Sequence, residues 1–241
     1  ILLCRAIAFS DMEVELLNYD EEVLAKSIAV KTFDGEITRI DRITHDIRGI
    51  RVALASPMKF WAGQYVDITV TTEKGETITR SFSMANTPDE AEKLAFIIKK
   101  YPEGRFSGEL DSGGIRVGAS VTVTGPYGTC FRRENREGPL ILVGAGSGMA
   151  PIWSILHDHL ASGEPRPVHL FYAARTRADL FHLDRIQAPL PAPPPARLLP
   201  LLSPAAADPR SPVPRAFPHL TVHPPLPHLS LDPLCRDPQP R

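Results

Sequence analysis

The spacing of apolar residues changes part-way along the chain, and this change restricts the folds open to it. Residues 25–135 carry short strand-like runs that Gly and Pro separate at short intervals. This pattern favours an antiparallel β-barrel or sandwich. The runs are Ser27–Thr32, Glu36–Ile43, Arg51–Leu54, Tyr65–Val70, Leu94–Lys100 and Ser120–Thr124.

A different pattern follows. Leu140–Val143 is a continuous apolar run, as in strands buried on both faces of a sheet. Pro151–Ser162 has helical spacing, and Val168–Tyr172 is a second apolar run. These segments predict one βαβ unit, with the start of a second helix at Asp179–Ile186. The chain is therefore expected to fold as an antiparallel β-barrel domain followed by a partial α/β domain over residues 136–186.

Composition changes abruptly near residue 187. Residues 187–241 hold 17 of the 25 prolines and none of the 16 glycines. Proline removes backbone donors and blocks the interiors of helices and sheets, while glycine supplies the positive-φ positions of turns. We expect this segment to be a disordered or polyproline-like tail.

Charge and cysteine usage exclude several classes of protein. The formal net charge is −1, which gives no basic field for nucleic acid. No run of 18 or more apolar residues predicts a membrane span, and the first residues lack the layout of a signal peptide. Three widely spaced cysteines argue against a disulfide framework and favour a cytoplasmic protein.

Arg80-Ser81-Phe82-Ser83 is the first of three motifs suited to a phosphorylated cofactor. A guanidinium offers a planar fork of donors for a pyrophosphate, the Phe82 ring can lie against an isoalloxazine, and a serine hydroxyl can donate to a ring nitrogen. Strand alternation places Arg80 and Phe82 on one face and the two serines on the other, unless the strand bends. Taken alone, the motif favours the simpler interpretation of an exposed arginine beside a core phenylalanine.

The other two motifs are glycine-led helix starts. Gly104-Arg105-Phe106-Ser107 precedes a short predicted helix, whose free first amides and dipole suit phosphate oxygens. An ordinary turn with a capping serine is the alternative. Gly144-Ala145-Gly146-Ser147-Gly148 follows a buried strand and opens a helix, which is the context of a nucleotide-binding turn. Pro151 falls in the first helical turn, where its missing N–H costs nothing.

In order along the chain, these motifs and Gly125-Pro126-Tyr127-Gly128 resemble those of the ferredoxin-NADP-reductase-like superfamily. Tyr101–Ser107 and Phe171–Thr176 narrow the resemblance to the reductase component of multicomponent soluble di-iron monooxygenases, such as those for methane, propane or phenol. These proteins join a plant-type [2Fe-2S] domain to an FAD barrel and an NADH domain. The resemblance covers residues 1–186.

The resemblance implies a role for each matching residue. Arg80 would hold the FAD pyrophosphate, Phe82 would stack on the flavin, and Ser83 would act beside its reactive nitrogen. The remaining matches line the flavin, hold the pyrophosphate, or bind the nicotinamide nucleotide. They are Ile98 and Lys99 for the flavin, Gly104, Phe106 and Ser107 for the pyrophosphate turn, and Gly144, Gly146, Ser147, Gly148, Pro151 and Arg175 for the second nucleotide.

Both ends depart from the family pattern. Cys4 matches the last cysteine of the [2Fe-2S] cluster, which makes residues 1–24 the remnant of a ferredoxin domain whose other three cysteines are missing. The later Cys-Gly-Pro motif is also missing, and the Pro-rich tail stands in its place. A GC-rich gene read out of frame gives such a sequence, so we expect a frameshift near residue 187.

The resemblance implies an electron-transfer enzyme. Hydride would pass from NADH to FAD, and single electrons would leave through the [2Fe-2S] cluster to an oxygenase component. The reductase of a ring-hydroxylating dioxygenase is the alternative within the same class. The alternative from another class is a non-functional fragment whose Pro-rich tail at most binds a partner groove.

Overall fold

The computed structural model describes residues 20–134, 136–182 and 196–202. Residues 31–127 form a first domain around one sheet, and residues 140–202 form a second domain around another. The elements of the first are β1 (Lys31–Arg42), β2 (Ile47–Leu54), β3 (Tyr65–Thr71), β4 (Thr77–Ser83), η2 (Pro88–Glu90), β5 (Lys93–Lys99), α2 (Arg105–Ser112) and β6 (Ser120–Tyr127), preceded by α1 (Glu21–Ala25). Those of the second are β7 (Leu140–Ala145), η3 (Gly146–Gly148), α3 (Met149–Ser162), β8 (Val168–Ala174), η4 (Arg177–Asp179) and β9 (Ala196–Leu202).

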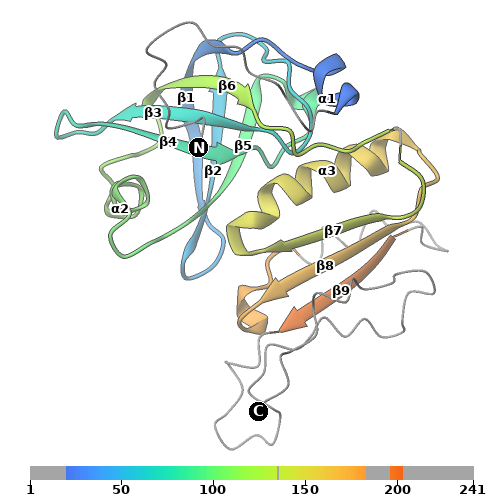
Figure 1. The fold of residues 1–241 in the computed structure, drawn as a ribbon. Helices are drawn as coiled ribbons and strands as arrows, with labels where there is room; N and C mark the ends of the chain where they lie inside the picture. Colours follow the sequence, from blue (N-terminus) through green and yellow to red (C-terminus); the bar gives the residue numbers. More distant parts are fainter. Residues whose placement is uncertain (1–19, 135, 183–195, 203–241) are drawn as a thin grey trace, which may run out of the picture.

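The first domain is a curled antiparallel sheet of six strands in the order β4-β3-β6-β1-β2-β5 (Figure 1). A bridge between Met84 and Phe96 brings its two edges together. Alternate residues of β3 are buried, and Ile37, Val66 and Val123 have no exposed surface. The predicted antiparallel architecture is confirmed.

Strand β1 is a single strand, whereas the sequence predicted two separate runs in this part of the chain. Residues 27–30 lie before the strand, and Lys31–Arg42 is continuous through Gly35. A Cβ at Gly35 would lie 2.8 Å from the carbonyl oxygen of Ala53 on β2. The glycine therefore allows close approach of two strands, where the sequence suggested a turn.

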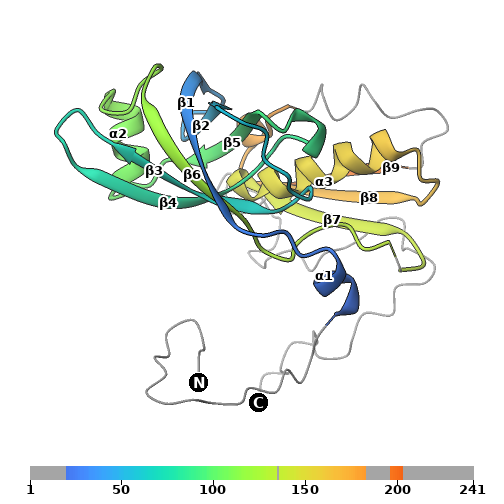
Figure 2. The ribbon, with the colours of Figure 1, turned by 90° about the horizontal axis from the view of Figure 1, so that it is seen from above.

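The second domain is a parallel sheet in the order β7-β8-β9, with α3 crossing from β7 to β8 (Figures 1 and 2). The predicted βαβ unit is confirmed, and its helix begins two residues earlier than expected, at Met149. Asp179 ends a short 3₁₀ turn, and residues 180–182 are not helical, so the predicted second helix does not begin there. Thr176 explains this local structure, because its N–H and hydroxyl both donate to the Asp179 carboxylate and close the turn.

Strand β9 lies within the segment predicted to lack regular structure, so that prediction is wrong for Ala196–Leu202. Five of these seven residues are Ala or Leu, and the segment pairs with β8 from Val168–Ala196 to Ala174–Leu202. Among the described strands β9 is an edge, where a proline such as Pro200 is tolerated because one side of the strand makes no ladder bonds. Residues 183–195 and 203–241 lie outside the described part of the chain.

Burial of β7 also differs from expectation. Ile141 is 39% exposed and Val143 is 54% exposed, whereas Leu142 faces α3 and is buried. The described residues therefore cover one face of β7, while the sequence predicted burial on both. Within the same described ranges, no helix has the length and apolar character to cross a membrane.

The two domains meet along α3. Ile155 and Leu156 of the helix share one buried cluster with Ala62 and Ile97 of the first domain. The Ser154 hydroxyl, which has no exposed surface, donates to the carbonyl oxygen of Asn86 at 2.6 Å. A Cβ at Gly63 would run into the Cys130 carbonyl oxygen and the Ile155 side chain. The contact is thus close-packed.

Asp158 on α3 is expected to limit stability at neutral pH. Burial raises the pKa of its carboxyl above the ordinary value of 3.8, although the Arg132 guanidinium, 3.8 Å away, opposes that shift. The folded pKa lies above the unfolded one, so stability falls as pH rises through that window. Asp158→Asn should therefore stabilise the protein at pH 7 by no more than about 1 kcal/mol, since the side chain is 34% exposed.

Thermal unfolding of Asp158→Asn and the parent at two pH values checks this. The gain should be present at pH 7 and shrink as the pH is lowered, because the parent carboxyl then becomes protonated. A loss of stability at pH 7 would mean that the pair with Arg132 outweighs the cost of burial.

Candidate functional site

A cavity of about 330 Å³ lies where β4, β5, α2 and the turn after β7 come together. It unites most of the cofactor residues predicted in the first domain with one from the second. The predicted residues in its lining are Arg80, Phe82, Ile98, Lys99, Gly104, Phe106, Ser107 and Ser147. A larger cavity of about 620 Å³ lies between β2, β5 and α3, and no predicted cofactor residue lines it. We take the smaller one as the candidate functional site because residues of the three motifs predicted to bind phosphate line it.

Arg80 lies on β4 with its guanidinium in solvent. One Nη1 hydrogen bond goes to the Thr79 carbonyl oxygen at 2.7 Å, and no acidic partner is found among the described residues. Ser81 also lines the cavity, and its hydroxyl donates to Asp67 at 2.5 Å. The donors of Arg80 are thus available to an anion in the cavity.

Phe82 forms the apolar floor of the site. Its ring meets the Phe106 ring edge-on, with centroids 4.9 Å apart, and lies 6.4 Å from Phe96. Ser83, predicted to act on the flavin, is not in the cavity lining; it is half-buried and pairs with Tyr65 on β3. The structure does not bring Ser83 to the site, and its role stays a prediction.

The start of α2 presents backbone amides of the kind that suit a phosphate group. Gly104 is the N-cap and has no side-chain capping bond, so the first amides of the helix lack an acceptor within the helix. A Cβ at Gly104 would collide with the Ser107 hydroxyl. That hydroxyl accepts from the Tyr101 N–H at 3.3 Å and so shapes the turn. An oxygen anion fits this arrangement through the helix dipole and free amides.

The turn between β7 and α3 is built in the same way. Gly146 has φ of +51°, and Gly148 caps α3 without a side-chain bond. A Cβ at Gly144 would lie 2.5 Å from the Met149 sulfur, so the helix start packs closely against this glycine. Pro151 occupies the first turn of α3, as predicted. The donor sets of the two turns, together with the Arg80 guanidinium, suit the phosphate groups of two cofactors.

Comparison with protein families gives the same division. Residues 34–131 match the model of the oxidoreductase FAD-binding domain, and residues 142–211 match that of the oxidoreductase NAD-binding domain. Together they account for more than half of the chain. The chain belongs to the ferredoxin-NADP-reductase-like oxidoreductases. Its first domain is the FAD-binding domain and its second the NAD-binding domain, whose match continues past residue 186 and includes β9. The match thus extends beyond the predicted domain end at residue 186.

Reductases of oxygenase systems are among the similar proteins. The reductase component of propane 2-monooxygenase from Mycolicibacterium goodii is 43% identical over 77% of this chain and 53% of its own. A reductase component of naphthalene 1,2-dioxygenase/salicylate 5-hydroxylase systems from Ralstonia is 38% identical over 78% and 55%. The crystal structure of an Amycolatopsis cytochrome P450 reductase superposes with a TM-score of 0.65, at 32% identity over 72% and 52%. The chain spans about half the length of these relatives.

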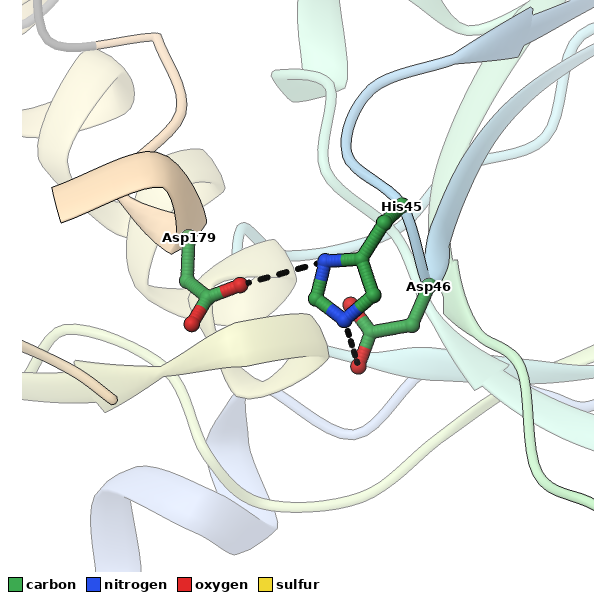
Figure 3. A group of neighbouring side chains, drawn as sticks. All are labelled: His45, Asp46 and Asp179. Carbon is green, nitrogen blue, oxygen red and sulfur yellow. Dashed lines mark ion pairs between the residues drawn. The ribbon is translucent and has the colours of Figure 1, made fainter. Parts of the chain in front are cut away.

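A charged group that the sequence did not predict lies between the two domains. Arg175, expected near the second nucleotide, donates from Nη2 to the Asp46 carboxylate at 2.9 Å. Lys99, expected beside the flavin, lies 3.6 Å from the same carboxylate. His45 stands between Asp46 and Asp179, at 3.8 Å and 3.4 Å (Figure 3). The β1–β2 turn thus reaches across to the NAD-binding domain.

Asp46 is the residue of this group that contacts His45, Lys99 and Arg175. Its burial alone would raise the pKa of the carboxyl, but a hydrogen bond from Thr44 and the positive charges of His45, Lys99 and Arg175 hold that pKa below its ordinary value. Among the described residues, His45, Asp46 and Asp179 are the only set whose ligand atoms lie close enough for a metal ion. Because Asp46 already pairs with two cations, we describe the set as an ion-pair network between the domains. Cys4, the predicted cluster ligand, lies outside the described residues.

Proposed function

We propose that this chain is the part of a monooxygenase reductase component that binds FAD and oxidises NADH. The observation that carries the proposal is the shared cavity, in which Arg80, Phe82 and Ser107 of the FAD-binding domain meet Ser147 of the nucleotide turn. The 43% identity to a propane 2-monooxygenase reductase component supports the monooxygenase class. We place the protein in the cytoplasm on its cysteine usage.

Each group at the cavity has a task that follows from its chemistry. Arg80 and the first amides of α2 bind pyrophosphate oxygens, and the Phe82 ring offers apolar surface to a planar ring system. The glycine turn after β7 binds the nucleotide phosphates with backbone N–H groups. A bound flavin supplies the chemistry, because it accepts two electrons as hydride and releases them singly. The protein therefore contributes position and electrostatics.

The next acceptor of the electrons is proposed from the relatives and from the cysteines of this chain. A [2Fe-2S] cluster requires four ligands of the thiolate or imidazole type, and the chain contains three cysteines, of which Cys130 lies exposed in the linker between the domains. The cysteines present do not fit the cluster, so we derive no step through it. We propose that electrons leave the flavin for an oxygenase component, either directly or through a cluster held by other cysteines.

A ring-hydroxylating dioxygenase is the second candidate for the oxygenase partner. The 38% identity to a reductase component of naphthalene dioxygenase systems favours it over unrelated acceptors. Electron delivery to purified oxygenase components of the two classes distinguishes the candidates, since only the true partner supports turnover of its own substrate.

Reduction of bound FAD by NADH under anaerobic conditions tests the proposal. We expect NADH to bleach the oxidised flavin absorbance, and Gly146→Ala to weaken NADH binding by about tenfold, because a Cβ disfavours positive φ by about 1–2 kcal/mol and misplaces the turn amides. Gly138→Ala is the matched control, since Gly138 has φ of +83° and equally open surroundings but lies outside the turn. A chain that retains FAD but neither binds NADH nor is reduced by it would contradict the proposal.

A further inference from the structure

The geometry points to Asp46 as the residue that makes this site select NADH over NADPH, through its ion pair with Arg175. The inference rests on the proposed function and deepens it. Asp46 belongs to the FAD-binding domain, whereas the nucleotide turn and Arg175 belong to the NAD-binding domain. Nucleotide selection is thus assigned to a residue contributed from across the domain boundary.

The position of Arg175 gives it access to the second nucleotide. In parallel sheets ligands bind beyond the carboxyl ends of the strands. Strands β7 and β8 are in parallel register, with Gly144 opposite Tyr172, so the glycine turn after β7 and Arg175 after β8 open on the same edge. The Arg175 side chain is 59% exposed, which leaves room for a ligand beside its pair with Asp46.

Hydrogen bonds to the backbone and side chain of Asp46 fix its carboxylate beside Arg175. Its carbonyl oxygen accepts from the Lys100 N–H at 2.7 Å. Its Oδ1 accepts from the Thr44 hydroxyl at 3.1 Å, which leaves Oδ2 for Arg175 and Lys99. The carboxylate is therefore ordered by the β1–β2 turn before any nucleotide arrives.

The charges around Arg175 disfavour a second phosphate. Asp46 pairs with the guanidinium at 2.9 Å, and Asp179 lies 3.9 Å from its Nε. A 2′-phosphate on the adenosine ribose must compete with these carboxylates for Arg175, and it carries negative charge toward them. The 2′-hydroxyl of NADH faces no such competition. The carboxylates of Asp46 and Asp179 thus repel the 2′-phosphate of NADPH and disfavour its binding.

Replacement of Asp46 with asparagine should relax this selection. Asparagine keeps the shape and the Thr44 hydrogen bond but frees Arg175 and Lys99 to meet a phosphate. We expect Asp46→Asn to tighten binding of adenosine 2′,5′-bisphosphate about tenfold, the size of one charge-assisted contact, and to change binding of adenosine 5′-monophosphate less than about twofold. Titration calorimetry on the FAD-loaded full chain measures both.

Two further variants make the test specific. Asp41→Asn removes the same charge from the same hairpin, where Asp41 pairs with Arg39, and should change neither affinity. In an Arg175→Ala background Asp46→Asn should lose most of its effect, because the two residues act as a pair. Equal changes for both adenosine ligands, or for both aspartate variants, would overturn the inference and leave the proposed function standing. If no variant binds any adenosine ligand, the proposed function fails as well.

Discussion

Replacement of Arg80 with alanine is expected to weaken FAD binding by about tenfold to a hundredfold, as the loss of charged hydrogen bonds worth about 1.5–3 kcal/mol predicts. The Arg80 guanidinium is exposed to solvent at the cavity, and no carboxylate among the described residues forms an ion pair with it. Its loss should therefore remove contacts to the cofactor without breaking an internal ion pair. Fluorescence titration of the apoprotein with FAD measures the effect.

A matched variant separates this loss from a general change of surface charge. Arg116 is also exposed and pairs with Glu73, away from the cavity. Arg116→Ala should leave FAD affinity within about twofold of the parent, as surface pairs contribute little. An unchanged affinity in Arg80→Ala would show that the pyrophosphate is bound elsewhere.

Removal of β9 is expected to abolish binding of NADH while FAD stays bound. β8 lies between β7 and β9, and its Val168, Leu170 and Tyr172 are almost fully buried. Without β9 the outer edge of β8 loses its ladder partner, so the NAD-binding domain loses order. The FAD-binding domain has a separate buried cluster and should keep its cofactor.

Two shortened chains test this. A chain ending at Ile186 lacks β9, and a chain ending at Leu202 keeps it. Trypsin should cleave the first rapidly after Arg175 and the second slowly, and only the second should bind NADH as the full chain does. Equal behaviour of both would show that residues 187–202 are dispensable, as their composition suggested.

The structural features that could be predicted from the sequence depend on residues close together in the chain. Gly104 and Gly146 are predicted to lie at helix starts, and the structure places Gly104 at the N-cap of α2 and Gly146 in the turn before α3. Strand alternation likewise predicted β3 and β6, because a half-buried strand shows its inner face in every second residue. The two-domain architecture could be predicted from these elements. Short turns join the strands of an antiparallel sheet, whereas parallel strands need a crossover such as α3.

What the sequence did not reveal depends on distant contacts. Asp46 and Arg175 are 129 residues apart, and no local pattern marks an ion pair between two surface groups. The composition of residues 187–241 concealed β9, because the pairing of Ala196–Leu202 depends on the free edge of β8. Three consecutive residues, Arg80 to Phe82, line the cavity, whereas simple alternation along the strand placed Ser81 on the face opposite Arg80 and Phe82.

The close packing at Gly63 limits how reductases of this kind can exchange parts by recombination. A crossover in the linker after Gly128 would bring in a foreign α3, whose residue at the Ile155 position must fit against a bare glycine. That helix would also need a hydroxyl at the Ser154 position to satisfy the Asn86 carbonyl. A hybrid with a bulkier residue there would spread the two halves and move Ser147 away from Arg80. Compatible parents for such hybrids should therefore be chosen by the residues of this seam, even when their cofactor motifs are identical.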